Sequence, residues 1–154
     1  LMMPLLLTHA LLPALRKAGD ARILNIGSTF GNIGYPGYAP YCASKAGLRA
    51  FTEALRRELA DTPLKVMYLA PRATQTTLND ERVVAMNKAL GNAVDSPTLV
   101  ADAVAGMIVR GNKNQLFIGW PEKLFARLNQ LLPGIVDGAL RKQLETIKRF
   151  ARQL

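Results

Sequence analysis

The chain has 154 residues, a length that suits one domain whose core buries roughly 70% of the surface of the unfolded chain. A composition of 49% hydrophobic and 20% charged residues is typical of a folded globular protein and excludes a disordered chain. The net charge of +9 does not indicate a nucleic-acid partner, because the basic residues are not interleaved with stacking aromatic side chains and form no known binding motif.

The opening segment "LMMPLLLTHALLPALRKAG" predicts a helix that ends with basic residues and with Gly19 as a candidate C-cap. Thr8, His9 and Pro13 interrupt its apolar run, so we expect no membrane-spanning helix. No basic residues precede the run and no small-x-small cleavage site follows it, which argues against a secretory signal. Because the sequence opens inside a helix, we expect it to be truncated.

The remaining segments alternate between strand-like and helix-like patterns. Short apolar runs predict strands, and longer stretches with apolar residues at helical spacing predict helices. The predicted strands cover residues 22–27, 64–70 and 115–120, and the predicted helices cover 42–61, 96–111 and most of the chain after Pro121. Ser96 is the predicted N-cap and Gly111 the predicted stop of the 96–111 helix. This alternation predicts an α/β fold with a parallel sheet.

The lone cysteine and the lone histidine carry little chemistry by themselves. Cys42 cannot form an internal disulfide, so we expect the cytoplasm rather than an oxidising compartment. Its place near a helix start can lower a thiol pKa, but packing in the core is the favoured role of a free cysteine. His9 has no cysteine, histidine or carboxylate partner within helical reach, so we expect no metal site.

The Gly-rich stretch from Ile23 to Phe51 holds three tyrosines, and helical spacing distinguishes among them. Residues four apart share one helix face, which places Lys45 beside Tyr41 and leaves the other two tyrosines without a cation. A nearby ammonium lowers the pKa of a phenol from about 10 and makes it a usable acid or base. A tyrosine and a lysine one turn apart are also common on a solvated helix face.

A serine at the end of the preceding strand supports the catalytic interpretation. Ser28 follows the strand at 22–27, and open α/β sheets place ligands at the carboxyl ends of their strands. The loop between Ser28 and Tyr41 contains glycines and Pro36, which allow it to fold back. Asn32 and Tyr35 lie in this loop and are candidates either for substrate contacts or for shaping its turns.

With these residues in place, nearly the whole chain resembles the short-chain dehydrogenase/reductase family. Ser28, Tyr41 and Lys45 match the family's Ser and Tyr-x-x-x-Lys pattern, and "YCASKAGLRAFTEALRRELA" is similar to its active-site helix. The resemblance implies that Tyr41 transfers the proton, that Lys45 holds the nicotinamide ribose and favours the phenolate, and that Ser28 hydrogen-bonds the carbonyl. It further implies NAD or NADP as cofactor and a small carbonyl or alcohol substrate.

The segment after "VMYLA" departs from the family's Pro-Gly-x-Val-x-Thr stretch. Pro71 and Thr76 match, whereas Arg72 replaces the glycine and Thr74 replaces the valine. By resemblance, Pro71, Thr74 and Thr76 are cofactor contacts, with Arg72 adding a charge and removing backbone freedom.

The family's glycine-rich phosphate loop has no counterpart in these 154 residues. By resemblance we therefore expect the C-terminal part of an enzyme. That part carries the last three strands of a seven-stranded, Rossmann-like, doubly wound parallel sheet. We expect the isolated fragment to be inactive.

The tail carries a net charge of +4 over residues 121–154 and reads as two amphipathic helices broken at Pro133 and Gly134. A basic amphipathic helix can lie on an anionic membrane, but its Leu and Phe stripe favours packing on protein. We predict residues 1–120 as the C-terminal part of a Rossmann-like catalytic domain, with 121–154 packed on it, in a homo-oligomer. A catalytically silent binding or membrane-associated module is the alternative to an oxidoreductase.

Overall fold

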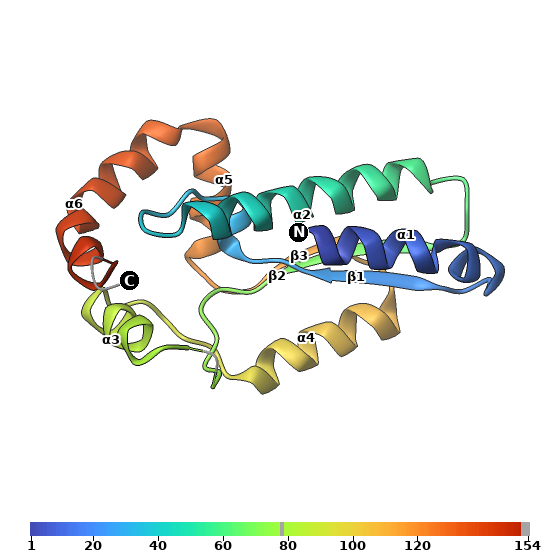
Figure 1. The fold of residues 1–154 in the computed structure, drawn as a ribbon, viewed down its shortest axis with the longest axis horizontal. Helices are drawn as coiled ribbons and strands as arrows, with labels where there is room; N and C mark the ends of the chain where they lie inside the picture. Colours follow the sequence, from blue (N-terminus) through green and yellow to red (C-terminus); the bar gives the residue numbers. More distant parts are fainter. Residues whose placement is uncertain (78, 152–154) are drawn as a thin grey trace.

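A computed structural model describes residues 1–77 and 79–151 of the chain, with a three-stranded sheet between helices (Figure 1). The strands are β1 (Arg22–Ile26), β2 (Lys65–Ala70) and β3 (Gln115–Phe117). The helices are α1 (Met2–Lys17), the 3-10 turn η1 (Thr29–Gly31), α2 (Ala39–Glu58), α3 (Glu81–Ala89), α4 (Pro97–Arg110), α5 (Glu122–Leu131) and α6 (Pro133–Ala151).

The sheet is parallel throughout, with the strands in the order β1-β2-β3. Ile23 pairs with Val66, and Leu69 pairs with Leu116. The central strand β2 is buried from Val66 to Ala70, as expected for a strand covered on both faces. The predicted α/β fold with a parallel sheet is therefore confirmed.

Helices cover both faces of the sheet, α1 and α2 on one side and α4 on the other (Figure 1). Successive side chains of a strand point to opposite faces, so β2 contributes to both cores. Val66 packs with Leu55 and Leu59 of α2, while Met67 and Leu69 pack with Met107 of α4. These two apolar layers hold the sheet between the helices and thereby fix the position of the edge at which the strands end.

Most predicted helix and strand boundaries agree with the structure within a few residues. Ser96 caps α4 by accepting a hydrogen bond from the Leu99 amide, and Gly111 ends the helix at φ 58°, both as predicted. Helix α2 begins at Ala39, three residues before the predicted start, because Pro40 suits the first turn of a helix. Lys17 is the last residue of α1, as the basic C-terminal turn predicted.

Two elements differ from the prediction. Helix α3 was missed, although Asp80 caps it by accepting a hydrogen bond from the Arg82 amide. Strand β3 ends at Phe117 rather than at residue 120, because the backbone at Gly119 turns to φ 103° and leaves the extended conformation.

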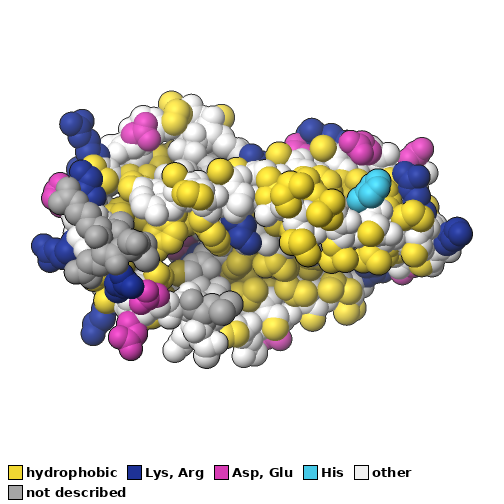
Figure 2. Space-filling model, viewed as in Figure 1, with side chains coloured by type: hydrophobic (Ala, Val, Ile, Leu, Met, Phe, Trp, Pro, Cys, Tyr) yellow, Lys and Arg dark blue, Asp and Glu magenta, His cyan; other side chains and the backbone are white. Residues whose placement is uncertain are grey.

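The tail forms two helices, as predicted, but the break lies at Leu132 rather than at Pro133 and Gly134. Pro133 is the first residue of α6, a position that suits proline, and Gly134 follows it within the helix. Ile147 of α6 is fully buried and packs with Tyr35 and Cys42, so the predicted burial of Cys42 is confirmed. Lysine and arginine side chains gather at the end of the molecule where α6 lies (Figure 2). No helix in the described ranges has the length and apolarity needed to cross a membrane. The division of the chain at residue 120 stays a prediction.

Candidate active site

The site begins where β1 ends, at Gly27 and Ser28. A side-chain carbon on Gly27 would lie 2.0 Å from the Tyr68 hydroxyl oxygen, so this position accepts only glycine. The Ser28 amide donates to the Tyr68 hydroxyl at 3.4 Å, and that hydroxyl donates to the Ser28 carbonyl at 3.4 Å. Burial raises the pKa of Tyr68, which keeps the phenol protonated beneath the site. Sequence reasoning missed this supporting role of Tyr68.

Ser28 is buried and serves as the N-cap of η1. Its Oγ accepts a hydrogen bond from the Phe30 amide at 3.2 Å. This contact orients the side chain and uses one acceptor position of the hydroxyl, whose proton can still be donated. Ser28 is thus a positioned donor at the carboxyl end of β1.

Helix α2 brings Lys45 against the same strand end. Gly31 of η1 lies so close to α2 that a side-chain carbon there would be 2.8 Å from the Lys45 carbonyl oxygen. The Lys45 Nζ donates to the Ile26 carbonyl at 3.3 Å and lies 5.6 Å from the centre of the Tyr41 ring. Burial lowers the pKa of Lys45. Lys45 therefore joins the end of β1 to Tyr41.

Tyr41 is the exposed member of an aromatic cluster formed by Phe30, Tyr35, Tyr38 and Tyr41. Its ring packs edge-on to Phe30 at 6.3 Å and to Tyr38 at 6.4 Å, and 42% of the residue is exposed. Burial raises the pKa of both Tyr35 and Tyr38. Tyr41 thus combines exposure with a cation at its ring, as the helical spacing predicted.

The two predicted substrate contacts lie in different environments. Tyr35 lines a cavity, and its buried hydroxyl makes no hydrogen bond of ordinary geometry with the residues the structure describes. Asn92 nevertheless lies close enough to oppose the rise in the pKa of Tyr35. Asn32 does not line that cavity. Its carbonyl accepts a hydrogen bond from the Asn129 side chain at 2.8 Å, which ties the loop to α5.

The segment after β2 holds the three predicted cofactor contacts. The Pro71 carbonyl accepts a hydrogen bond from the Thr29 amide at 3.0 Å, which joins this segment to η1. The Thr74 hydroxyl donates to the Arg72 carbonyl at 3.1 Å, within its own loop, and Thr76 is exposed. Their contact with a cofactor stays a prediction.

Arg72 forms a partly buried ionic cluster that sequence reasoning missed. Its Nε and Nη2 donate to the two carboxylate oxygens of Asp95 at 2.9 and 2.7 Å, and its Nη1 donates to Glu122 at 3.3 Å. Hydrogen bonding to Asp95 raises the pKa of Arg72, so the guanidinium stays charged. No local pattern pairs residues 23 and 50 positions apart, so the sequence contains no signal for this cluster.

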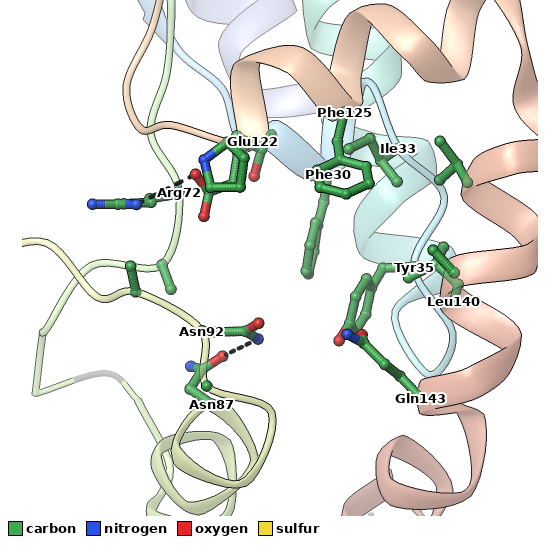
Figure 3. A pocket seen from close by; sticks show the side chains of 17 residues that line it. Phe30, Ile33, Tyr35, Arg72, Asn87, Asn92, Glu122, Phe125, Leu140 and Gln143 are labelled. Carbon is green, nitrogen blue, oxygen red and sulfur yellow. Dashed lines mark hydrogen bonds and ion pairs between the residues drawn. The ribbon is translucent and has the colours of Figure 1, made fainter.

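Phe30 and Tyr35 of the aromatic cluster face Arg72 and Glu122 of the ionic cluster across a cavity of about 290 Å³ (Figure 3). Its apolar wall includes Phe30, Tyr35, Phe125 and Leu140, and the facing side carries Arg72, Glu122, Asn87 and Asn92. Gln143 lies beside Tyr35 (Figure 3). Phe30 lines this cavity and also contacts the Tyr41 ring, so it links the cavity to the candidate catalytic residues. Within the described ranges, no three His, Cys, Asp or Glu side chains are grouped to hold a metal ion.

The comparisons with known proteins agree with this architecture. A family model of short chain dehydrogenases matches residues 1–87. The chain is 36% identical over 104 residues to 3-oxoacyl-[acyl-carrier-protein] reductase FabG of Vibrio cholerae, covering 64% of this chain and 43% of the relative. It is 34% identical over 142 residues to ketoacyl reductase HetN of Nostoc, covering 88% of this chain and 48% of the relative.

A solved structure shows the same fold. It is a short chain dehydrogenase from Burkholderia cenocepacia in complex with NADP. The TM-score is 0.69 at 23% identity, covering 86% of this chain and 52% of that one. This likeness confirms the predicted Rossmann-like fold. The chain spans about half the length of the curated relatives it matches.

Proposed function

The chain belongs to the short-chain dehydrogenase family, and on that premise we propose that the protein is an NAD(P)-dependent oxidoreductase that interconverts a carbonyl and an alcohol by hydride transfer. The observation that carries the proposal is the position of Lys45. One ammonium contacts both the Ile26 carbonyl, two residues before Ser28, and the Tyr41 ring. Lys45 thereby holds the end of β1 and the exposed phenol of Tyr41 close together.

In this proposal, the chain's own residues handle the proton and the developing charge. The hydroxyls of Ser28 and Tyr41 donate hydrogen bonds to the substrate oxygen, whose negative charge grows as the carbonyl is reduced. Tyr41 gives its proton to that oxygen, and Lys45 stabilises the resulting phenolate. Alcohol oxidation uses the same residues in reverse, with Tyr41 accepting the proton.

The residues at this edge fit a nicotinamide cofactor. Lys45 makes one hydrogen bond within the described ranges, to the Ile26 carbonyl, so two of its three N–H donors are available to a ribose hydroxyl. Pro71, Thr74 and Thr76 are the proposed further contacts. When bound, the cofactor supplies or accepts the hydride. NAD and NADP are both compatible with these residues.

The proposal is tested by replacing Tyr41 with Phe in the protein expressed from its full reading frame. The change keeps the ring contact with Phe30 and removes the hydroxyl, so the fold survives and turnover falls by about 10²-fold or more, the scale of general acid–base catalysis. Tyr38→Phe is the matched control, because Tyr38 has no lysine one turn on. Near-normal turnover by Tyr41→Phe would refute the proposed role and favour the silent binding module.

We expect residues 1–154 alone to bind NADH or NADPH weakly and to be inactive. The reason is that this sequence contains no glycine-rich phosphate loop, which in the family supplies much of the dinucleotide site. A fluorescence titration of this polypeptide with each cofactor measures the affinity. Micromolar binding would contradict the expectation.

We also propose that the protein acts in the cytoplasm and forms a homo-oligomer. Apolar side chains spread over the region of α1 in Figure 2, and the large exposed ones on this helix are Met2, Met3, Leu6, Leu7 and Leu11. An exposed apolar row of this kind is typical of an interaction surface. Light scattering on the full-length protein tests for a second copy, and a monomer at all concentrations would contradict it.

A further inference from the structure

We propose that the cavity lined by Phe30 and Tyr35 selects uncharged ketones and alcohols with a flat apolar body and a hydrogen-bonding group, and rejects substrates that carry a carboxylate. The inference rests on the proposed oxidoreductase function, because that function makes a bound ketone or alcohol a substrate. The observations behind it are those of the cavity. Two features of the walls carry it: the one cation that lines the cavity is already paired with carboxylates, and among the described residues the buried Tyr35 hydroxyl has no hydrogen bond of ordinary geometry.

The ionic cluster leaves no cation for an anionic ligand. Arg72 and Glu122 are the charged residues that line the cavity among those the structure describes. All three guanidinium nitrogens of Arg72 already donate to carboxylates, two of them to Asp95. The charges of Arg72 and Glu122 on the cavity wall cancel, and Asp95 lies behind them as the second partner of Arg72. A ligand carboxylate that enters the cavity therefore loses its water and finds no unpaired cation among the described lining residues.

The opposite wall favours a flat apolar body. Phe30 and Tyr35 stack with ring centres 4.5 Å apart and planes 12° from parallel, and Phe125 and Leu140 extend the same wall (Figure 3). Phe30 also contacts the Tyr41 ring at 6.3 Å. Phe30 is therefore the lining residue that links the cavity to the proposed proton donor, which does not itself line it.

A polar group on the ligand has a recognition point at Tyr35. The residue is 8% exposed, and its side chain points into the cavity toward the Asn92 side (Figure 3). Within the part of the chain that the structure describes, its hydroxyl has no hydrogen bond of ordinary geometry, although Asn92 lies nearby. A buried hydroxyl without a well-formed hydrogen bond is costly, and a ligand that bonds to it recovers that cost. Asn87 and Asn92, hydrogen-bonded to each other at 3.1 Å, add amide donors and acceptors nearby.

The test measures equilibrium binding rather than turnover, with two probes of nearly equal shape. The protein expressed from its full reading frame is titrated by calorimetry with p-acetylbenzamide, which is neutral, and with p-acetylbenzoate, which is an anion. We expect the amide to bind about tenfold more tightly or better. Equal or tighter binding of the benzoate, or no binding of either probe, overturns the proposal.

Two variants assign the effect to the named residues. Glu122→Gln removes one negative charge from the wall, so the preference for the amide should fall about tenfold. Glu145→Gln, the same change at an exposed position of α6, should leave it unaltered. Tyr35→Phe should weaken p-acetylbenzamide about fivefold and leave p-methylacetophenone unweakened. An unaltered preference in Glu122→Gln, with circular dichroism showing the native fold, refutes the role of the ionic cluster.

Failure of this inference is distinguishable from failure of the proposed function. A protein that binds the amide selectively but reduces no carbonyl retains the cavity specificity and loses the oxidoreductase assignment. A protein that reduces ketones but binds the benzoate as well as the amide retains the activity and loses the specificity.

Discussion

Replacing Arg72 with Met should cause a large loss of stability, because it leaves two carboxylates without their cation. The Arg72 side chain is 18% exposed and that of Asp95 is 5% exposed, so this is a buried pair. Removing one partner of a buried ion pair costs about 3–5 kcal/mol, since the other charge stays buried and uncompensated. For a domain of about this size each kcal/mol lowers Tm by about 2–4 °C, so we expect a decrease of about 6–20 °C.

The assay is urea and thermal unfolding of the full-length protein followed by far-ultraviolet circular dichroism. Arg57→Met is the matched control, because Arg57 pairs with Glu53 on α2 but is 72% exposed, and such a pair contributes at most about 1 kcal/mol. The double variant Arg72→Met with Asp95→Leu should recover much of the loss, because apolar residues of similar volume often replace a buried pair at little cost. An Arg72→Met protein that loses no more stability than Arg57→Met would refute this reasoning.

Three further predictions concern the surroundings of the site. Gly31→Ala should destabilise the protein by about 1–3 kcal/mol in urea unfolding, because the new carbon meets the Lys45 carbonyl oxygen at 2.8 Å, whereas Gly34→Ala, with open space around it, should not. Burial raises the pKa of Tyr68 above its value of about 10 in the unfolded chain, so the stability that the buried phenol contributes is complete below about pH 10 and is lost as the pH rises toward the raised pKa. Tyr68→Phe should therefore flatten the decline of the unfolding free energy at alkaline pH. An unaltered decline would contradict this reasoning. Ile147 of α6 packs with Tyr35 and Cys42, so we predict that the tail packs on protein and that the protein does not co-sediment with anionic vesicles at physiological salt; salt-sensitive binding would favour the membrane alternative.

Local patterns were sufficient to predict most of the fold. The apolar run of β2 indicated a strand covered on both faces, and Ser96 and Gly111 marked the ends of α4 correctly. These features depend on residues a few positions apart, where backbone geometry and capping follow from residue type. Helix α3 was not predicted because its apolar residues show only a weak helical pattern, although Asp80 caps its first turn.

Part of the candidate site could be predicted for the same reason. Tyr41 and Lys45 are one helical turn apart, and the structure places the lysine 5.6 Å from the tyrosine ring. Ser28 was expected at the strand end and lies there, as the N-cap of η1. The catalytic and binding roles of these residues stay predictions until the variants are assayed.

The sequence by itself determined the elements, the parallel α/β arrangement and the candidate catalytic residues, because each follows from spacing within a few turns or from a family pattern. Only the tertiary structure decided which distant residues meet. Arg72 appeared in the sequence as a departure from a family motif, and folding pairs it with Asp95 and Glu122, which come from two other segments. The cavity likewise joins η1, α3, α5 and α6, and its charge balance exists only once the chain has packed these elements around a common space.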